Sequence, residues 1–278
     1  MVKKGKVRLD ALLVERGFFT SREQARRAIM AGLVFYEGRR VEKAGEFVDP
    51  NGVVEVKGNP CPYVSRGGLK LEGALRCFGV DVSGKVALDA GASTGGFTHC
   101  LLEHGAKRVY AVDVGYGQLA WQLRQDPRVV VRERTNIRYL KPDDLGTRVD
   151  LVTLDLSFIS LEKVLPAVWE LLNDGGEVIA LVKPQFEAGR EHVGKGGIVK
   201  DPEVHYRVLE RIIGVSAGIG FQVKGLTYSP LLGADGNAEF FLWLAKGDSG
   251  SAVLVSSEDI RRVVETAHKA LLGKDGGN

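Results

Sequence analysis

The stretch Val86-Ala-Leu-Asp-Ala-Gly-Ala-Ser-Thr-Gly-Gly-Phe-Thr98 is an apolar strand that runs into a glycine-rich turn and then into a helix. Glycines in such a turn let the backbone approach a ligand closely, and the free N–H groups at the start of the helix offer donors to it. Asp113 closes the next apolar segment, where an acidic side chain can accept both hydroxyls of a ribose. The pattern predicts a site for a nucleotide or nucleoside cofactor.

Three details favour S-adenosylmethionine over a dinucleotide. The turn reads G-x-x-x-G-G rather than G-x-G-x-x-G, Asp89 precedes its first glycine, and Asn136 follows the third predicted strand, where an amide can contact adenine. A dinucleotide enzyme and a purely structural turn remain alternatives at this point. The residues expected to bind the cofactor are Asp89, Gly91, Ser93, Thr94, Gly95, Gly96, Phe97, Asp113, Asn136 and Asp155.

Downstream of Ser65, apolar strands alternate with helical segments, which is typical of a parallel α/β sheet. Seven strands with a final antiparallel hairpin predict a class I S-adenosylmethionine methyltransferase fold, Rossmann-like and mostly parallel. The expected strands are Val86–Asp89, Arg108–Asp113, Val129–Glu133, Leu151–Leu156, Glu177–Val182, Gln222–Tyr228 and Glu239–Ala245. We predict a methyltransferase domain over residues 65–248, followed over 249–278 by a connector and a C-terminal helix at about Glu258–Leu272.

Residues 1–60 predict a small α+β domain, which a linker over residues 61–64 joins to the larger one. Apolar residues at helical spacing end at Gly17, and Ser21 is expected to cap a second helix whose apolar stripe ends before Gly32. Residues 34–41 predict a hairpin that turns at Gly38, and residues 53–56 predict a further strand.

The excess of positive over negative charge in the chain lies entirely in this N-terminal segment. Residues 1–60 hold twelve Lys and Arg against eight Asp and Glu, whereas the rest of the chain holds 26 against 27. Arginines grouped on one helical face can bind successive phosphates, so a polyanion such as RNA is the expected partner. The residues expected to bind RNA are Arg8, Arg22, Arg26, Arg27 and Arg66, although a solvated helix face remains the alternative for the helical ones.

The N-terminal segment resembles the RNA-binding domain named after ribosomal protein S4. The resemblance rests on Arg8-Leu-Asp-Ala-Leu-Leu-Val-Glu-Arg-Gly17, Ser21-Arg-Glu-Gln-Ala-Arg-Arg-Ala-Ile29 and Gly32-Leu-Val-Phe-Tyr-Glu-Gly38.

Four charged residues stand in apolar or constrained settings of the larger domain: Lys70, Asp155, Lys183 and Glu239. The carboxyl ends of parallel strands face the ligand crevice, and the antiparallel last strand starts on that side, so Asp155, Lys183 and Glu239 are expected to meet there. A ribose hydroxyl is a weak nucleophile that must be aligned with the methyl group, a task for which a lysine held by carboxylates is suited. Each residue by itself would more often be an ordinary solvated strand residue.

This set resembles the K-D-K-E tetrad of FtsJ-type ribose 2′-O-methyltransferases. Further runs resemble the TlyA family of haemolysin A-like rRNA methyltransferases. They are Ser65-Arg-Gly-Gly-Leu-Lys-Leu71, Asp89-Ala-Gly-Ala-Ser-Thr-Gly-Gly-Phe-Thr98, Asp155-Leu-Ser-Phe-Ile-Ser160, Lys183-Pro-Gln-Phe-Glu-Ala-Gly-Arg190 and Val193-Gly-Lys-Gly-Gly-Ile-Val199. The resemblance implies S-adenosylmethionine-dependent 2′-O-methylation of cytidines in ribosomal RNA by a cytoplasmic enzyme that needs no metal. His99 stands where the family leads us to expect an acid, and we interpret it as a helix-surface residue.

Other classes of protein are less consistent with the sequence. A membrane-active haemolysin would need an apolar span, and no run approaches the ~18 residues that a bilayer requires. Cys61, Cys77 and Cys100 form no C-x-x-C pair, so neither a disulfide framework nor a zinc site is expected. A noncatalytic RNA-binding ribosome-assembly factor would have no use for the four charged residues, and no cysteine lies at the end of strand four as in many base methyltransferases. The target nucleotide, the ribosomal subunit and the oligomeric state stay open.

Overall fold

The computed structural model describes residues 5–19, 21–57, 61–233, 235–247 and 252–273 of the 278-residue chain. Their contacts divide the chain into two compact units, Met1–Pro62 and Tyr63–Asn278. The basic residues 1–4, part of the linker (58–60), most of the predicted connector (248–251) and the chain end (274–278) lie outside the described residues.

The smaller unit is built from two short helices and five short strands around one apolar core. The side chain of Ser21 accepts a hydrogen bond from the backbone N–H of Gln24 at 3.3 Å, so it caps the second helix as predicted. Glu37 and Gly38 both have positive φ, which is the geometry of a two-residue hairpin turn. The elements are β1 (Val7–Arg8), α1 (Leu9–Glu15), α2 (Arg22–Met30), β2 (Val34–Tyr36), β3 (Arg39–Arg40), β4 (Phe47–Val48) and β5 (Val54–Val56).

The larger unit contains a seven-stranded sheet in the order β11-β12-β10-β9-β6-β7-β8. Strand β12 runs antiparallel to both of its neighbours, and the other described ladders of this sheet are parallel. The strands are β6 (Val86–Ala90), β7 (Arg108–Val112), β8 (Val129–Arg132), β9 (Val149–Leu154), β10 (Leu172–Val182), β11 (Phe221–Tyr228) and β12 (Phe240–Lys246). The predicted fold class is therefore confirmed.

Strand β10 begins earlier than the sequence predicts. Its pairing with β9 shifts in register between Leu172 and Glu177, where the polar run Asn173-Asp-Gly-Gly176 interrupts the apolar pattern. An irregular strand with polar residues at the interruption has no clear alternation to recognise, so sequence reasoning began the strand at Glu177.

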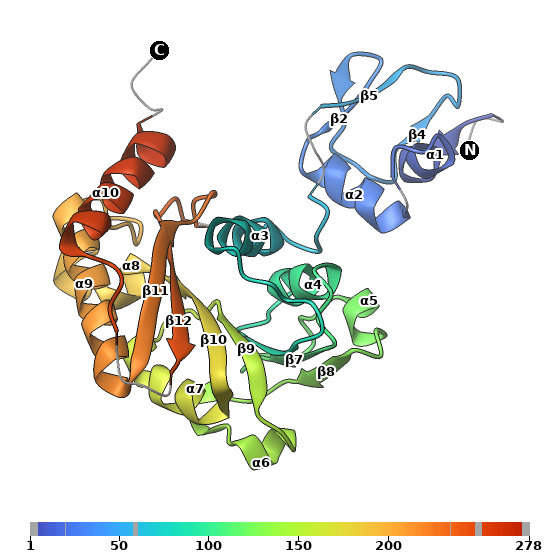
Figure 1. The fold of residues 1–278 in the computed structure, drawn as a ribbon. Helices are drawn as coiled ribbons and strands as arrows, with labels where there is room; N and C mark the ends of the chain where they lie inside the picture. Colours follow the sequence, from blue (N-terminus) through green and yellow to red (C-terminus); the bar gives the residue numbers. More distant parts are fainter. Residues whose placement is uncertain (1–4, 20, 58–60, 234, 248–251, 274–278) are drawn as a thin grey trace. The chain divides into compact units, whose positions relative to one another are not determined.

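Helices cover both faces of the sheet (Figure 1). Alternating strand residues pack toward α7, α9 and α10 in one large buried cluster, whereas α4 contacts β6 and β7 and packs with α3. The helices are α3 (Gly67–Phe78), α4 (Gly96–Glu103), α5 (Trp121–Arg124), α6 (Pro142–Leu145), α7 (Leu165–Leu171), α8 (Pro184–Glu187), α9 (Pro202–Ile219) and α10 (Ser257–Ala267). Single 3₁₀ turns lie at Ile137–Tyr139, Leu161–Lys163 and Arg190–His192, and α10 continues as a π-helix over His268–Leu272.

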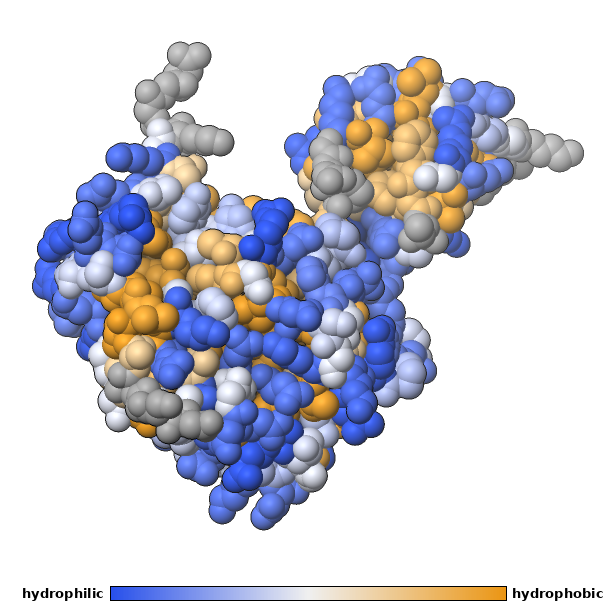
Figure 2. All heavy atoms as spheres, in the orientation of Figure 1, coloured by the Kyte–Doolittle hydropathy of each residue, from blue (hydrophilic) through white to orange (hydrophobic). Residues whose placement is uncertain are grey.

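Hydrophilic side chains cover much of the face drawn in Figure 2, with hydrophobic groups showing between them. Within the described part of the chain, no helix has both the length and the apolar character that a membrane crossing requires.

Candidate active site

Two adjoining cavities open at the carboxyl ends of the parallel strands. They share Gly91, Ser93 and Asp155, so one continuous depression runs past the glycine turn. The larger, the nucleoside cavity, has a volume of about 510 Å³ and is lined by Gly91, Ser93, Val112, Asp113, Val114, Gln118, Thr135, Asn136, Ile137, Asp155, Leu156, Ser157, Phe158 and Ile159. The other, the reaction cavity, has a volume of about 420 Å³ and is lined by Ser65, Arg66, Gly67, Lys70, Gly91, Ala92, Ser93, Thr94, Gly96, Phe97, Asp155 and Leu232.

The glycine turn leaves no room for side chains at two positions. Gly91 has a φ of +83°, and a Cβ atom there would lie 2.3 Å from the backbone oxygen of Asp155. A Cβ atom on Gly96 would lie 2.2 Å from the Ser65 hydroxyl, at the first turn of α4. The turn therefore presents backbone at Gly91 and Gly96 to the cavities, while Ser93 lines both of them.

Asp113 and Asn136 both line the nucleoside cavity and also hold the loops around it. The carboxylate of Asp113 accepts hydrogen bonds from the backbone N–H groups of Ser93 and Gly115, each at 2.7 Å. The Asn136 side chain accepts from the backbone N–H of Arg138 at 3.1 Å. Carboxylate oxygens have further lone pairs and the Asn136 amide has further donors, so both residues retain capacity for a ligand.

Two residues expected to bind the cofactor line neither cavity. Asp89 is fully buried, and its two oxygens accept hydrogen bonds from the Thr98 and Thr153 hydroxyls at 2.7 and 3.0 Å. Burial raises the pKa of Asp89 to about 7, although both hydroxyls act to lower it. Asp89 was expected to bind the cofactor, but in the structure it instead joins β6 to α4 and β9 through these two hydrogen bonds. Gly95 faces away as well, since a Cβ atom on it would lie 2.3 Å from Leu123.

The four charged residues meet as two ion pairs. Lys70 on α3 donates a hydrogen bond to Glu239, immediately before β12, at 2.6 Å. Lys183, immediately after β10, lies 2.7 Å from Asp155, immediately after β9, and also donates to the Ser157 hydroxyl at 3.2 Å. Lys70 and Asp155 both line the reaction cavity, so the pairs lie at its wall.

Burial dominates the electrostatics of Glu239. Its side chain is 3% exposed, and burial raises its pKa above the ordinary value. The ammonium groups of Lys70 and Lys183 act in the opposite direction and lower that pKa, whereas the charge of Asp155 raises it. The other three charges therefore all act on Glu239, and Lys70 compensates a carboxylate that would be costly to bury alone.

The five arginines expected to bind RNA are in three different situations. Arg8 and Arg22 both donate to the fully buried carboxylate of Asp10, and these contacts help to lower the pKa of Asp10 to about 2. Arg26 is exposed on α2, and Arg27 is half-buried. Arg66, in the larger unit, is exposed at the wall of the reaction cavity.

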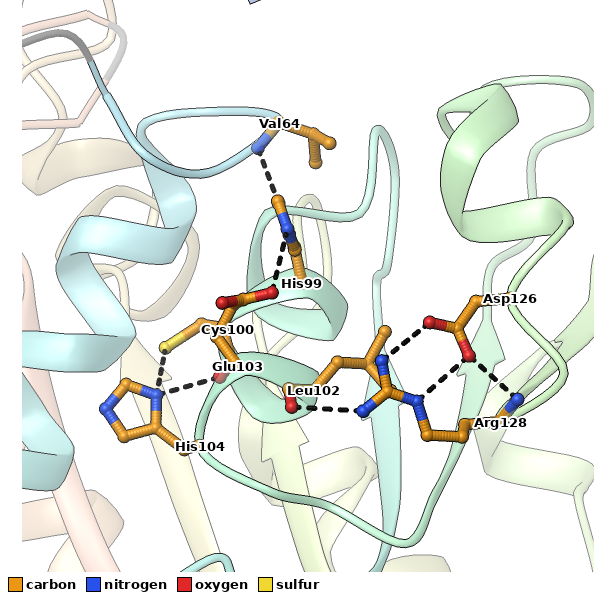
Figure 3. Close-up of polar contacts among 8 residues, drawn as sticks. All are labelled: Val64, His99, Cys100, Leu102, Glu103, His104, Asp126 and Arg128. Carbon is orange, nitrogen blue, oxygen red and sulfur yellow. Dashed lines mark hydrogen bonds and ion pairs between the residues drawn. The ribbon is translucent and has the colours of Figure 1, made fainter. Parts of the chain in front are cut away.

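His99 is not the helix-surface residue that the sequence suggested. Its side chain is only 16% exposed, its Nδ1 accepts a hydrogen bond from the backbone N–H of Val64 at 3.2 Å, and its Nε2 lies 3.6 Å from Glu103 (Figure 3). Its ring also meets the edge of Tyr63. His99 therefore attaches the segment that enters the larger unit to helix α4, a contact between residues far apart in sequence.

Sequence reasoning missed two aromatic residues beside Lys183. Phe158 is 90% exposed and has a φ of +63° that a bulky residue rarely adopts. Its ring packs against that of Phe186 in a tilted arrangement, with ring centroids 4.9 Å apart and an interplanar angle of 49°. The available signal was the position of Phe158 three residues after Asp155, inside one of the runs that resemble the TlyA family. Phe158 therefore places an exposed aromatic ring among the residues that line the nucleoside cavity.

Within the described ranges, no cluster of three or more His, Cys, Asp or Glu side chains is placed to hold a metal ion. The strand order, with its single antiparallel strand, together with the glycine turn and Asp113, defines the larger unit as a class I methyltransferase domain.

Comparison with known proteins identifies the family. Residues 63–246 match the FtsJ-like methyltransferases, and residues 7–54 match the S4 domain. The chain is 56% identical over 273 residues to the Bacillus subtilis protein named "Putative rRNA methyltransferase YqxC", a match that covers 97% of this chain and 96% of that protein. It is 50% identical over 240 residues to the Mycobacterium tuberculosis 16S/23S rRNA (cytidine-2′-O)-methyltransferase TlyA, a match that covers 86% of this chain and 90% of that one.

The solved structure of a protein named "Putative hemolysin from Streptococcus thermophilus" is similar over nearly the whole chain. It is 47% identical, has a TM-score of 0.78, and the match covers 98% of this chain and 99% of that one. The chain belongs to the FtsJ-like methyltransferase family, among the TlyA proteins that join such a domain to an S4 domain.

Proposed function

We propose that this protein transfers a methyl group from S-adenosylmethionine to the 2′-hydroxyl of a ribose, most specifically that of a cytidine in ribosomal RNA. The observation that carries the proposal is the pairing of Lys183 with Asp155 and of Lys70 with Glu239 at the wall of a cavity that continues into the nucleoside cavity. The relatives named as rRNA (cytidine-2′-O)-methyltransferases support the choice of substrate.

The residues present fit S-adenosylmethionine. Asp113 lines the nucleoside cavity with a carboxylate suited to ribose hydroxyls, and Asn136 offers an amide for adenine. Gly91 lines both cavities and has no room for a side chain, so its backbone is what a ligand would meet there. Thr94, Phe97 and Asp155 line the reaction cavity, where the methionine part would lie. When bound there, the cofactor supplies an electrophilic methyl group on a sulfonium.

The chain's own residues would orient the nucleophile and take up its proton. Methyl transfer would form the bond from the ribose O2′ to the methyl carbon as the bond from sulfur to that carbon breaks, with its electron pair remaining on the sulfur of a neutral thioether, and the hydroxyl proton would be released. Lys183, held by Asp155 and Ser157, would steer the hydroxyl from the wall of the reaction cavity, and the Lys183–Asp155 pair would receive the proton. Lys70, held by Glu239, adds a second fixed positive charge at the cavity wall. Positioning then accounts for much of the rate.

The exposed ring of Phe158 provides a surface for the base of the target nucleotide. A base that leaves its stack loses favourable contacts, and stacking on an aromatic side chain restores about 1–3 kcal/mol. Phe158 stands at the mouth of the nucleoside cavity, next to the serine that Lys183 binds. Its strained backbone is consistent with a functional demand on that position.

The N-terminal unit would bind the RNA. Its match to the S4 domain and the excess of positive charge in residues 1–60 support this role. Arg26 and Arg27 extend from α2, while Arg8 and Arg22 present the outer sides of guanidinium groups anchored on Asp10. We accordingly propose residues 1–60 as the RNA-binding domain, residues 65–248 as the catalytic domain, and ribosomal RNA or a ribosomal subunit in the cytoplasm as the partner.

Methylation mapping tests the proposal. The protein is incubated with labelled S-adenosylmethionine and purified ribosomal subunits, and reverse transcription at low nucleotide concentration then locates 2′-O-methyl groups as added stops. We expect label in RNA and a stop at a cytidine, both absent with Lys183→Ala. Label on a base, or RNA binding without any label, would support a base methyltransferase or an assembly factor instead.

A further inference from the structure

Glu187, at the end of α8, is a buried carboxylate outside the two ion pairs. Its side chain is 2% exposed, and both of its oxygens accept hydrogen bonds from the segment that follows β9. The Ser160 hydroxyl donates to Oε2 at 2.7 Å, and the backbone N–H of Leu161 donates to Oε1 at 2.8 Å. Burial raises the pKa of Glu187, whereas these two donors and the guanidinium of Arg211 act to lower it.

Arg211 of α9 completes the arrangement. Its guanidinium donates a hydrogen bond to the backbone oxygen of Glu187 at 2.6 Å, lies 3.6 Å from the Glu187 carboxylate, and forms an ion pair with Glu162. Arg211 therefore contacts two segments at once. One is α8, which follows β10, and the other is the 3₁₀ turn Leu161–Lys163, which follows β9. A buried acid with this many donors is a fixed point rather than a mobile side chain.

The same two segments bear the Lys183–Asp155 pair. The last paired residues of the β9–β10 ladder are Leu154 and Ala180, so the two strands do not pair directly at Asp155 and Lys183. There the backbone is held from the other sides instead, by the bond from the Asp155 N–H to the Ala90 oxygen and by the pairing of Val182 with Phe240 of β12. Between the Lys183–Asp155 pair and Glu187, the segments touch through Lys183 and Ser157 and through Phe158 and Phe186. Because Phe158 has a positive φ, its loop needs support from outside to keep its shape.

We propose that Glu187 is a positioning residue for the reaction: by joining the segment after β10 to the segment after β9, it holds the Lys183 ammonium against Asp155. This inference rests on the proposed function for its consequence on rate. Glu187 itself lines neither the nucleoside cavity nor the reaction cavity, so it acts through Lys183 and Asp155 rather than on substrate.

Three variants of the full-length protein test the inference. Glu187→Ala removes both acceptors. Glu187→Gln keeps the shape, because its amide oxygen can accept from Leu161 while its amide N–H donates to the Ser160 hydroxyl. Asp150→Ala is the matched control: Asp150 accepts from the backbone N–H of Val86 at 2.9 Å and from the Asn173 amide at 2.7 Å, and it lies at the opposite end of β9.

The measurements are kcat and KM for ribosomal RNA methylation, and hydrogen exchange of the Leu161 amide. Since a displacement of about 1 Å can cost a rate on the order of 100-fold, we expect a kcat loss of that order in Glu187→Ala, with a much smaller change in the KM for S-adenosylmethionine. Leu161 should exchange faster in Glu187→Ala alone. Glu187→Gln should recover most of kcat, and Asp150→Ala should keep it.

Wild-type kcat in Glu187→Ala would overturn the inference, and so would equal kcat losses in Glu187→Ala and Asp150→Ala, which would indicate general loosening. A wild-type protein that methylates no ribose would overturn the proposed function instead. In that case the hydrogen-exchange rate of the Leu161 amide still tests whether Glu187 joins the two segments. An unchanged rate in Glu187→Ala would refute that link, and a faster rate would support it.

Discussion

Replacing Lys70 by methionine should destabilise the larger unit in a manner that depends on pH. The Lys70 ammonium lies 2.6 Å from Glu239, and the two side chains are 12% and 3% exposed. Methionine is close in length and carries no charge, so Lys70→Met leaves the Glu239 carboxylate buried without its hydrogen-bonded partner. Removing one member of a buried ion pair typically costs about 3–5 kcal/mol.

The sign of the pH dependence follows from the pKa of Glu239. Burial already raises this pKa in the wild-type protein, and Lys70 is the main influence that lowers it, so the variant's pKa must be higher still. A folded-state pKa above the unfolded one means that the folded protein binds the extra proton. Stability is therefore greatest below the unfolded pKa of glutamate, about 4.3, and falls by up to about 1.36 kcal/mol per pH unit as pH rises toward the folded value.

Urea unfolding followed by tryptophan fluorescence measures this effect on the larger unit alone, because Trp121, Trp169 and Trp243 all lie in it. We expect Lys70→Met to lose the full amount, about 3–5 kcal/mol of unfolding free energy, at pH 8 and clearly less at pH 5. The double variant Lys70→Met/Glu239→Gln should regain most of the stability at pH 8, since its amide needs no counter-ion. An equal loss at both pH values, or a double variant as unstable as the single one, would refute the reasoning.

Three further predictions rest on contacts already described. Lys183→Ala should abolish methylation while calorimetry still detects binding of S-adenosylmethionine, because Lys183 lines neither cavity; near-normal turnover would contradict its role. Gly91→Ala should lose cofactor binding, since its Cβ would lie 2.3 Å from the Asp155 backbone oxygen and its φ is +83°, and unchanged affinity by calorimetry would count against the turn. Asp10→Asn should destabilise the smaller unit at neutral pH: the folded pKa of Asp10, about 2, lies below its ordinary value of 3.8, so its contribution is present above about pH 4 and is lost as pH falls toward 2. Amide exchange in α1 at pH 7 and pH 2.5 would measure this, and a variant that matches the wild type at pH 7 would disprove it.

The sheet could be predicted from the sequence because its signals are local. Each buried parallel strand is a short apolar run, and turns rich in glycine or polar residues separate the runs. The end of β10 was equally clear, since Lys183 ends an apolar segment, whereas the predicted strand Leu151–Leu156 runs two residues past the observed end of β9 at Leu154. That Asp155 and Lys183 meet follows from topology, because the carboxyl ends of parallel neighbours face the same crevice.

The residues that were misjudged depend on contacts distant in sequence. Asp89 has the right spacing for a ligand contact, yet hydroxyls on α4 and β9 occupy both of its oxygens, and no spacing rule reveals those partners. His99 was interpreted from its place on a helix, although its acceptor atom serves Val64, 35 positions earlier. Glu187 was not singled out by the sequence, because only its burial against Ser160 and Leu161 distinguishes it.

The charges of the site explain why a separate RNA-binding unit is needed. Lys70 and Lys183 are matched by Glu239 and Asp155, so the four residues together contribute no excess positive charge that would attract a phosphate backbone. That neutrality suits a site that must admit a sulfonium cation beside two ammonium groups, because an unmatched lysine would repel it. Attraction for the polyanion must then come from elsewhere, and the twelve Lys and Arg against eight Asp and Glu in residues 1–60 provide it. Methyl transfer thus favours a site without excess positive charge, whereas RNA binding favours positive charge, and a chain of two units can provide both.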